Sequence, residues 1–244
     1  SGKPLGELLP GLYTKEGYQQ GFEPALERLS GELMAEADWV LGASAGLHQA
    51  QAGAITQQVR ELYLEDYART WETLLADLAL VPSASLSQSV QMARLLSGPD
   101  SPLLKLVTAI VHETTLVPTP VAAADQAGNG LDRAKAQLGK LFDHDAASAL
   151  IPHPEPTAQR LVNDRFAPLR QLIAGELQSK PIQAVLKRLD ELYLQLAASE
   201  AAIRDRLPPP ASDIGVRLKA ESARLPDPLR SLLPPLAAMG TGQT

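Results

Sequence analysis

The sequence contains no cysteine, so disulfides, thiolate metal sites and cysteine nucleophiles are excluded. The absence of cysteine is compatible with a reducing cytoplasm and with an oxidising compartment, and therefore says nothing about location. Aromatic residues make up only 4% of the chain, whereas hydrophobic residues, chiefly leucine and alanine, make up 45%. This balance favours packed helices over β-sheet and predicts an all-α fold.

The sequence also lacks a basic stripe and long apolar runs. Its formal net charge is -6 and both signs are interspersed, so nucleic acid is an unfavourable partner. No run approaches the ~20 apolar residues of a membrane span, and no secretion signal opens the chain. Because it begins Ser1-Gly2 without methionine, we expect a soluble piece of a longer protein.

The N-terminal part, residues 1–116, is predicted to be helical. Thr14 is suited to cap a helix that ends near Trp39. The apolar residues of this helix recur at steps of three and four and predict one buried stripe. They are Tyr18, Phe22, Leu26, Leu29 and Leu33.

A second, longer helix is predicted between Pro24 and Pro82. Its expected apolar stripe comprises Ile55, Val59, Leu62, Tyr63, Tyr67, Trp71, Leu74 and Leu78. Its charged residues are expected to face solvent: Arg60, Glu61, Glu65, Arg69 and Glu72. The aromatic residues Tyr63, Tyr67 and Trp71 resemble a ligand platform, but helical spacing in an aromatic-poor chain favours a core role.

Proline and glycine mark the next boundaries. A helix with Leu86, Val90, Ala93 and Leu96 should stop at Ser97-Gly98-Pro99. Ser101-Pro102 then supplies an N-cap and a first-turn proline for another helix that buries Leu103, Leu106, Val107, Ile110 and Val111.

Residues 117–158 are predicted to form a proline- and glycine-rich linker with one short helix around 131–142. The C-terminal part, 159–244, is again predicted to be helical, with a passage at 161–173, a long helix from Pro181 to about Arg206 and short helices at 214–223 and 228–239. The architecture expected is an irregular multi-helix bundle with two long helices and proline-rich connections, in which both parts pack as one domain.

Candidate chemistry is sparse. His112-Glu113 resembles the start of a zinc-peptidase motif, but Leu116 stands where that motif has its second histidine. Asp143-His144-Asp145 is interpreted as a polar helix end, His153 as a loop residue, and His48 as following a connection at 42–46. No phosphate-binding loop is present. We therefore predict no enzyme and no catalytic, cofactor-binding or metal-binding residues, and leave partner-binding residues unassigned.

A series of segments resembles the TssM (IcmF) family of type VI secretion systems. In order, they are LPGLYTKEGY at 9–18, DWVLG at 38–42, VRELYLEDYARTWETLLADLALVP at 59–82, LLSGPDSPLLKLV at 95–107, ETTL at 113–116 and ARLPDPL at 223–229. The resemblance is strong over 5–116 and loose over 160–240.

This resemblance implies a periplasmic helical segment of an inner-membrane protein, with a structural role that positions the subunit between inner and outer membranes. It implies contacts with other copies of the protein, with the inner-membrane protein TssL, and with the outer-membrane lipoprotein TssJ, the last mainly through a C-terminal β domain outside this chain. No nucleotide-binding site carries over, because no residues match a phosphate loop.

Two other functions remain open from the residues alone. One is a free-standing helical adapter that binds a peptide or an apolar ligand between helices. The other, less favoured, is a metal hydrolase that uses His112 and Glu113.

Overall fold

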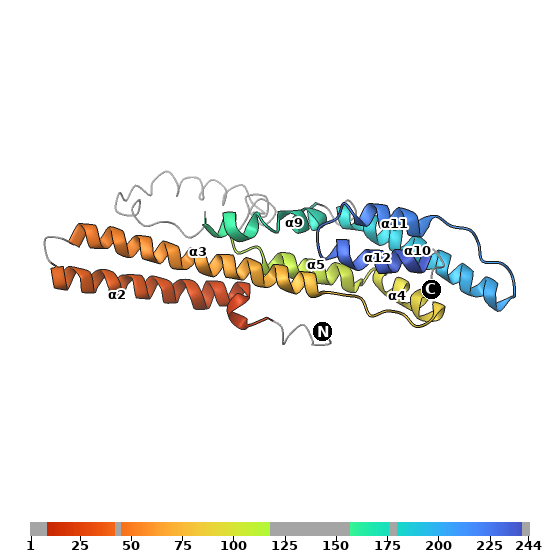
Figure 1. Ribbon diagram of the computed structural model, residues 1–244, viewed down its shortest axis with the longest axis horizontal. Coiled ribbons are helices and arrows are strands. Elements are labelled where there is room, and N and C mark those ends of the chain that lie inside the picture. Colours follow the sequence, from red (N-terminus) through yellow and green to blue (C-terminus); the bar gives the residue numbers. More distant parts are fainter. Residues whose placement is uncertain (1–8, 42–44, 118–156, 176–179, 241–244) are drawn as a thin grey trace, which may run out of the picture. The chain divides into compact units, whose positions relative to one another are not determined.

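The computed structural model describes residues 9–41, 45–117, 157–175 and 180–240, with the side chains of 36–49 outside that description. Every regular element in these ranges is a helix, which confirms the predicted all-α class (Figure 1). The linker predicted at 117–158, with its short helix, lies almost wholly outside the described residues. The domain prediction for this chain therefore stays a prediction.

The chain divides into two units that interleave in sequence. The first unit comprises Ser1–Lys3, Trp71–His112 and Phe166–Thr244, and the second comprises Pro4–Thr70 and Glu113–Arg165. One long helix, α3 (Ala45–Asp77), contributes residues to both. Each unit is described by itself below.

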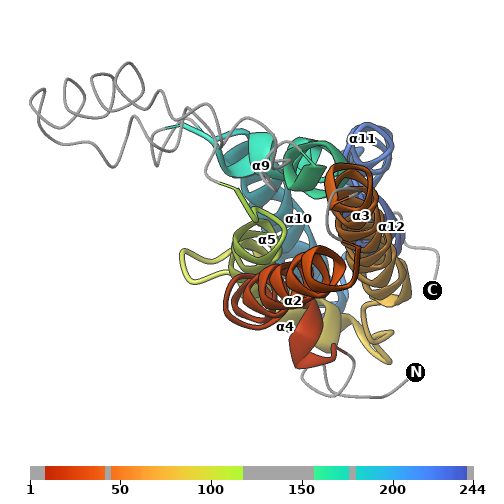
Figure 2. The same cartoon turned by 90° about the vertical axis from the view of Figure 1, so that its left-hand side faces the viewer.

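The second unit contains a short 3₁₀ helix, η1 (Gly11–Tyr13), a π-helical turn, η2 (Gly17–Phe22), and α2 (Glu23–Leu41), followed by most of α3 and a second π-helical turn, η5 (Gln159–Asn163). Helices α2 and α3 lie side by side in both views, and Figure 1 shows that they run in opposite directions (Figures 1 and 2). Thr14 is the predicted cap: its Oγ1 accepts a hydrogen bond from the Gly17 backbone N–H at 3.0 Å.

The predicted stripe of the first helix is only partly correct. Tyr18 and Leu26 are buried, whereas Leu29 and Leu33 are 49% and 37% exposed. The connection predicted at 42–46 is also too long, because Ala45 already begins α3.

The stripe predicted for α3 is correct only in its middle, since Leu74 is half-buried and Leu78 lies beyond the end of the helix at Asp77. Tyr63, Tyr67 and Trp71 are buried, which confirms their core role. Ile55, Val59 and Leu62 are exposed instead. The buried side of α3 is completed by other residues of the same helix: Ala52, Arg60, Leu64, Ala68 and Leu75.

The first unit is built from α4 (Leu86–Ser97), α5 (Pro102–Glu113), α9 (Ala167–Ile173), α10 (Pro181–Arg204), α11 (Ile214–Ser222) and α12 (Leu229–Gly240). Helix α10 packs against α4, α9, α11 and α12, and α11 also packs against α12. The starts of α4 and α5 have serine caps, Ser85 and Ser101, and α4 ends at Gly98 as predicted. The long helix predicted from Pro181 and the two short helices after it are confirmed within two residues.

Candidate functional site

Glu113, the acid of the hydrolase hypothesis, is used to cap a helix. Its Oε2 accepts a hydrogen bond at 2.7 Å from the backbone N–H of Lys15, the first residue after the Thr14 cap. Free N–H groups at a helix start favour a carboxylate. His112 is exposed, and Leu116, at the position of the missing second histidine, is 2% exposed. Glu113 therefore joins two segments of the second unit, far apart in sequence.

The other residues considered for chemistry are not brought together in the described ranges. Asp143, His144, Asp145 and His153 lie outside them, as does the side chain of His48. Within the described part of the chain, no group of three or more histidine and acidic residues gathers in a way that could hold a metal ion.

A largely buried ion pair joins Arg60 of α3 to Glu23 of α2 in the second unit. The Arg60 Nε and Nη2 atoms donate to the two Glu23 carboxylate oxygens at 3.0 and 3.1 Å, and Nη1 donates to Gln57 Oε1 at 3.2 Å. Gln57 Nε2 then donates to Thr157 Oγ1 at 2.8 Å. We call Glu23, Gln57, Arg60 and Thr157 the Arg60 joint.

The prediction that Arg60 faces solvent is wrong, because only 4% of the residue is exposed. A signal was present in the sequence: Arg60 precedes Leu64 by four positions and Tyr67 by seven, and therefore lies on the same side of the helix as these buried residues. The bidentate hydrogen bonds to Glu23 pair the charge of the Arg60 guanidinium, whose burial would otherwise be costly.

Five aromatic rings pack together beside the Arg60 joint, and we call them the aromatic cluster: Tyr13, Tyr18, Phe22, Tyr63 and Tyr67. The closest pair, Phe22 and Tyr63, is stacked with a centroid distance of 3.7 Å and an interplanar angle of 7°. The cluster fastens the segment before α2 onto α3, because Tyr13, Tyr18 and Phe22 come from that segment.

The tyrosine hydroxyls add directional contacts to this packing. Tyr63 Oη donates to the Leu12 carbonyl at 2.6 Å, Tyr67 Oη donates to the Glu113 carbonyl at 2.9 Å, and Tyr13 Oη donates to Asp66. Burial raises the pKa of Tyr63 above its usual value, and burial followed by the nearby Glu23 carboxylate raises the pKa of Tyr18. The hydroxyls of Tyr18 and Tyr63 therefore stay protonated at neutral pH.

The approach of η1 to the following turn requires a glycine. A Cβ added to Gly17 would lie 2.0 Å from the Gly11 carbonyl oxygen, a distance that no side chain tolerates. Gly17 therefore allows the contact that presents Leu12 and Tyr13 to α3.

Asn163 is a third polar contact of the second unit, and the sequence analysis did not single it out. Its side chain is fully buried; Oδ1 accepts from the Leu116 backbone N–H at 2.9 Å, and Nδ2 donates to the Val117 carbonyl at 2.7 Å. A buried asparagine of this kind fixes the chain just after α5 to the turn η5. Asn163 Nδ2 also donates to Gln159 Oε1 at 3.1 Å, one turn earlier. This local spacing does not predict the burial of Asn163, because the backbone groups that it bonds are 46 and 47 positions away.

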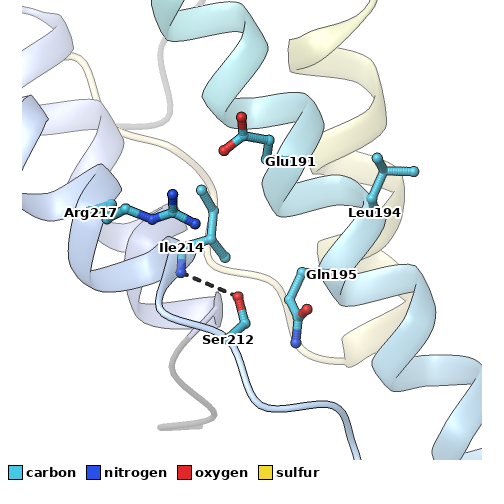
Figure 3. Close-up of a pocket in the computed structure, with 6 residues that line it drawn as sticks. All are labelled: Glu191, Leu194, Gln195, Ser212, Ile214 and Arg217. Atoms are coloured by element: carbon cyan, nitrogen blue, oxygen red, sulfur yellow. Dashed lines mark hydrogen bonds between the residues drawn. The ribbon is translucent and has the colours of Figure 1, made fainter.

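A surface hollow of about 470 Å³ lies between α10 and α11 in the first unit (Figure 3). Its lining consists of Glu191, Leu194, Gln195, Ser212, Ile214 and Arg217. The polar groups already have partners: Glu191 pairs with Arg188 at 2.8 Å, Arg217 with Asp213 at 2.8 Å, and Gln195 Nε2 donates to the Pro210 carbonyl at 2.8 Å. The hollow therefore presents no convergent set of unused polar groups to a substrate.

Comparison with known proteins agrees with the family resemblance of the sequence segments at 9–116 and 223–229. Residues 1–115 match the family model described as IcmF-related: Intracellular multiplication and human macrophage-killing. The chain is 35% identical over 215 residues to the type VI secretion system component TssM1 of Pseudomonas aeruginosa strain PAO1. That match covers 85% of this chain but only 19% of the relative, so the chain spans about a fifth of its length. No solved structure matches.

Proposed function

Because this chain belongs to the TssM (IcmF) family, we propose that it is a structural, non-catalytic segment of a type VI secretion system membrane complex. In this role the helices hold a fixed length and shape, so that the parts of the protein before and after the segment are spaced between the inner membrane and the outer-membrane lipoprotein.

The observation that carries this proposal is the use made of the polar side chains in the second unit. Arg60, Glu23, Glu113 and Asn163 each bond a group from another segment of the chain, and all four lie between helices or at helix ends. Directional contacts of this type fix the register of packed helices, which hydrophobic burial alone does not. A spacer that carries load requires such a fixed register.

The proposed setting is the periplasm. The proposed partners are other copies of the same protein, the inner-membrane protein TssL and the lipoprotein TssJ, the last mainly through a β domain outside this chain. None of the described helices has both the length and the apolar character needed to cross a membrane.

The test replaces single residues in the full-length protein, in bacteria that secrete by this system. Tyr67→Ala removes a fully buried ring and should lower both the amount of folded protein and the release of secreted substrate. His112→Ala removes the only described histidine whose side chain could serve a hydrolase, and it should leave both unchanged. A His112→Ala protein that accumulates normally but fails in secretion would contradict a purely structural role.

The adapter hypothesis is favoured by one observation, an exposed apolar surface on α2 and α3. An adapter that acts alone would bind a partner without the rest of the protein. Photo-crosslinking from positions on this surface in intact cells distinguishes the two proposals, because the structural proposal expects crosslinks to components of the secretion complex.

A further inference from the structure

The end of α10 projects from the packed part of the first unit and carries a loop of exposed residues. The last buried residue of α10 is Leu196, and none of residues 197–204 is buried. At about 1.5 Å per residue, these eight positions carry the helix about 12 Å beyond its last buried side chain. Residues 205–213 leave this end and return to α11 (Figure 1). We call residues 205–213 the proline loop, and every one of them is exposed.

The helix ends in a turn that strains an arginine. The Arg206 N–H donates to the Ile203 carbonyl at 3.1 Å, and the Leu207 N–H donates to the Ala202 carbonyl at 2.8 Å. These two hydrogen bonds define the Schellman motif, whose left-handed position is usually a glycine. Here Arg206 occupies that position with a φ of 58°, in a region that L side chains rarely adopt. Strain of this kind is typical of segments whose conformation serves a function.

Three consecutive prolines keep the loop extended after this turn. Proline fixes φ near about −65° and biases the residue before it toward the polyproline II conformation. Leu207, Pro208 and Pro209 each precede a proline, and residues 207–213 form no helix or strand. The sequence therefore favours a short polyproline II segment that begins directly at the strained turn.

The far end of the proline loop is fastened to the first unit. Gln195 Nε2 of α10 donates to the Pro210 carbonyl at 2.8 Å, and Ser212 Oγ accepts from the Ile214 N–H at 3.2 Å (Figure 3). The loop is thus held both by the turn at its start and by these hydrogen bonds at its end. A segment that is already ordered loses little conformational entropy when it binds.

The apolar and hydrogen-bonding groups of the loop face solvent. Ile203 and Leu207 are 58% and 61% exposed, and Pro208 and Pro209 are exposed as well. The carbonyl groups of Leu207, Pro208 and Pro209 accept no hydrogen bond from the described part of the chain. Because a polyproline II segment makes no internal hydrogen bonds, these carbonyls are available to donors on another molecule.

One positive charge at this end of α10 is left without a partner. Asp205 pairs with Arg204 at 3.7 Å, and Asp213 pairs with Arg217 at 2.8 Å. Arg206 is exposed and takes part in no ion pair among the described residues. The proline loop therefore combines apolar side chains and free carbonyls with a single unpaired guanidinium.

We propose that the proline loop docks into a groove of a partner protein, and that this groove is lined by aromatic rings and has a carboxylate at its edge. Such grooves take polyproline II segments, because the rings pack on the prolines. Leu207 lies in the groove beside the prolines, and Arg206 pairs with the carboxylate through two parallel hydrogen bonds. This goes beyond the proposed structural role, in which no partner-binding residue is assigned.

The first experiment identifies the partner in intact bacteria that secrete by this system. The full-length protein carries benzoylphenylalanine at Ala211, an exposed position of the proline loop. We expect a photo-crosslink to one partner protein, which tandem mass spectrometry places beside aromatic side chains. The matched control carries the same photo-reactive residue at Leu95, a leucine of α4 that is 62% exposed, and should not give this adduct. A Pro208→Ala, Pro209→Ala variant should give less of the adduct.

The second experiment separates recognition of Arg206 from its place in the turn. Arg206→Gly removes the charge and relieves the strain, so the midpoint of urea denaturation should stay the same or rise. Its affinity for the purified partner, measured by calorimetry, should fall by about fivefold or more, as should that of the Pro208→Ala, Pro209→Ala variant. Arg224→Ala, which removes an exposed arginine outside the loop, should bind as the native chain does.

The proposal would be overturned by the lack of any adduct from Ala211, or by an adduct only to lipid, to a second copy of the chain or to a protein surface without aromatic side chains. Arg206→Gly and proline variants that both bind the partner as tightly as the native chain would do the same. These outcomes do not affect the Tyr67→Ala and His112→Ala tests, so failure here is distinguishable from failure of the structural role.

Discussion

The two units use different chemistry to hold their helices. The second unit has the aromatic cluster, the Arg60 joint and Asn163, in which rings stack and buried polar groups bond across segments. The buried residues of the first unit are largely aliphatic, as shown by Leu189 and Leu192 of α10 and Leu218 of α11. Its ion pair between Arg188 of α10 and Glu221 of α11 stays partly exposed.

Because of this difference, the two units should tolerate amino-acid substitutions to different extents. Aliphatic packing is non-directional, and such surfaces accept substitutions that conserve volume. Stacked rings and bonded buried charges accept few arrangements, and removal of one partner leaves the other unsatisfied. We therefore expect the second unit to be the more sensitive of the two to single substitutions of polar residues.

The largest effect is expected for Tyr67→Ala. Tyr67 is completely buried within the aromatic cluster, and its hydroxyl donates to the Glu113 carbonyl. Loss of the ring leaves a cavity, and we expect the free energy of unfolding to fall by about 3 to 5 kcal/mol. Urea denaturation followed by circular dichroism measures it.

Tyr67→Phe is the matched control, because it keeps the ring and removes only the hydroxyl. It should cost about 1 kcal/mol. A loss below about 1 kcal/mol for Tyr67→Ala would show that the ring is not part of a packed core.

Substitution of Arg60 tests whether the buried ion pair distinguishes the second unit. Arg60→Met leaves Glu23, whose side chain is 12% exposed, without its main partner. The expected cost is about 3 kcal/mol. The double variant Arg60→Met, Glu23→Leu should recover most of this loss, because no charge is then left buried. Equal destabilisation of the single and double variants would locate the effect in packing.

Whether a structural feature can be predicted from the sequence depends on whether its interactions are local or join distant segments. Helix starts and stops at Thr14, Ser101 and Gly98 were predictable, because caps and breakers act over a few neighbouring residues. The burial of Tyr67 and Trp71 was predictable from helical spacing in an aromatic-poor chain.

Features that depend on distant segments were not predictable in this way. Arg60 is buried because a carboxylate arrives from α2, 37 positions earlier, and Asn163 is buried because backbone groups arrive from the end of α5. The exposure of Ile55 and Leu62 has the same origin, since periodicity predicts an apolar side of a helix but not whether this chain supplies its cover.

A rise in pH should weaken the second unit through its tyrosines. Burial raises the pKa of Tyr18 and of Tyr63 in the folded chain, so above about pH 10 the unfolded chain loses protons that the folded chain keeps. Stability contributed by these groups is complete below pH 10 and is lost as the pH rises further, by up to about 1.4 kcal/mol per pH unit for each tyrosine.

Urea denaturation at pH 7 and pH 11 measures this alkaline loss. The hydrogen bond to Asp66 also raises the pKa of Tyr13, so three hydroxyls contribute to the loss. Tyr63→Phe removes one of them and should reduce the loss by about a third to a half. An alkaline loss of the same size in Tyr63→Phe as in the native chain would assign it to other groups.

The smallest effect is expected for Arg188→Met in the first unit. Arg188 bonds Glu191 at 2.8 Å and Glu221 at 3.0 Å, but its side chain is 31% exposed and those of the two acids are 33% and 44% exposed. Water solvates the acids when the guanidinium is removed, and exposed ion pairs contribute little. The midpoint of urea denaturation should therefore stay within measurement error of the native value. A shift as large as that of Arg60→Met would show that the first unit depends on its charged contacts as strongly as the second, and would remove the distinction between them.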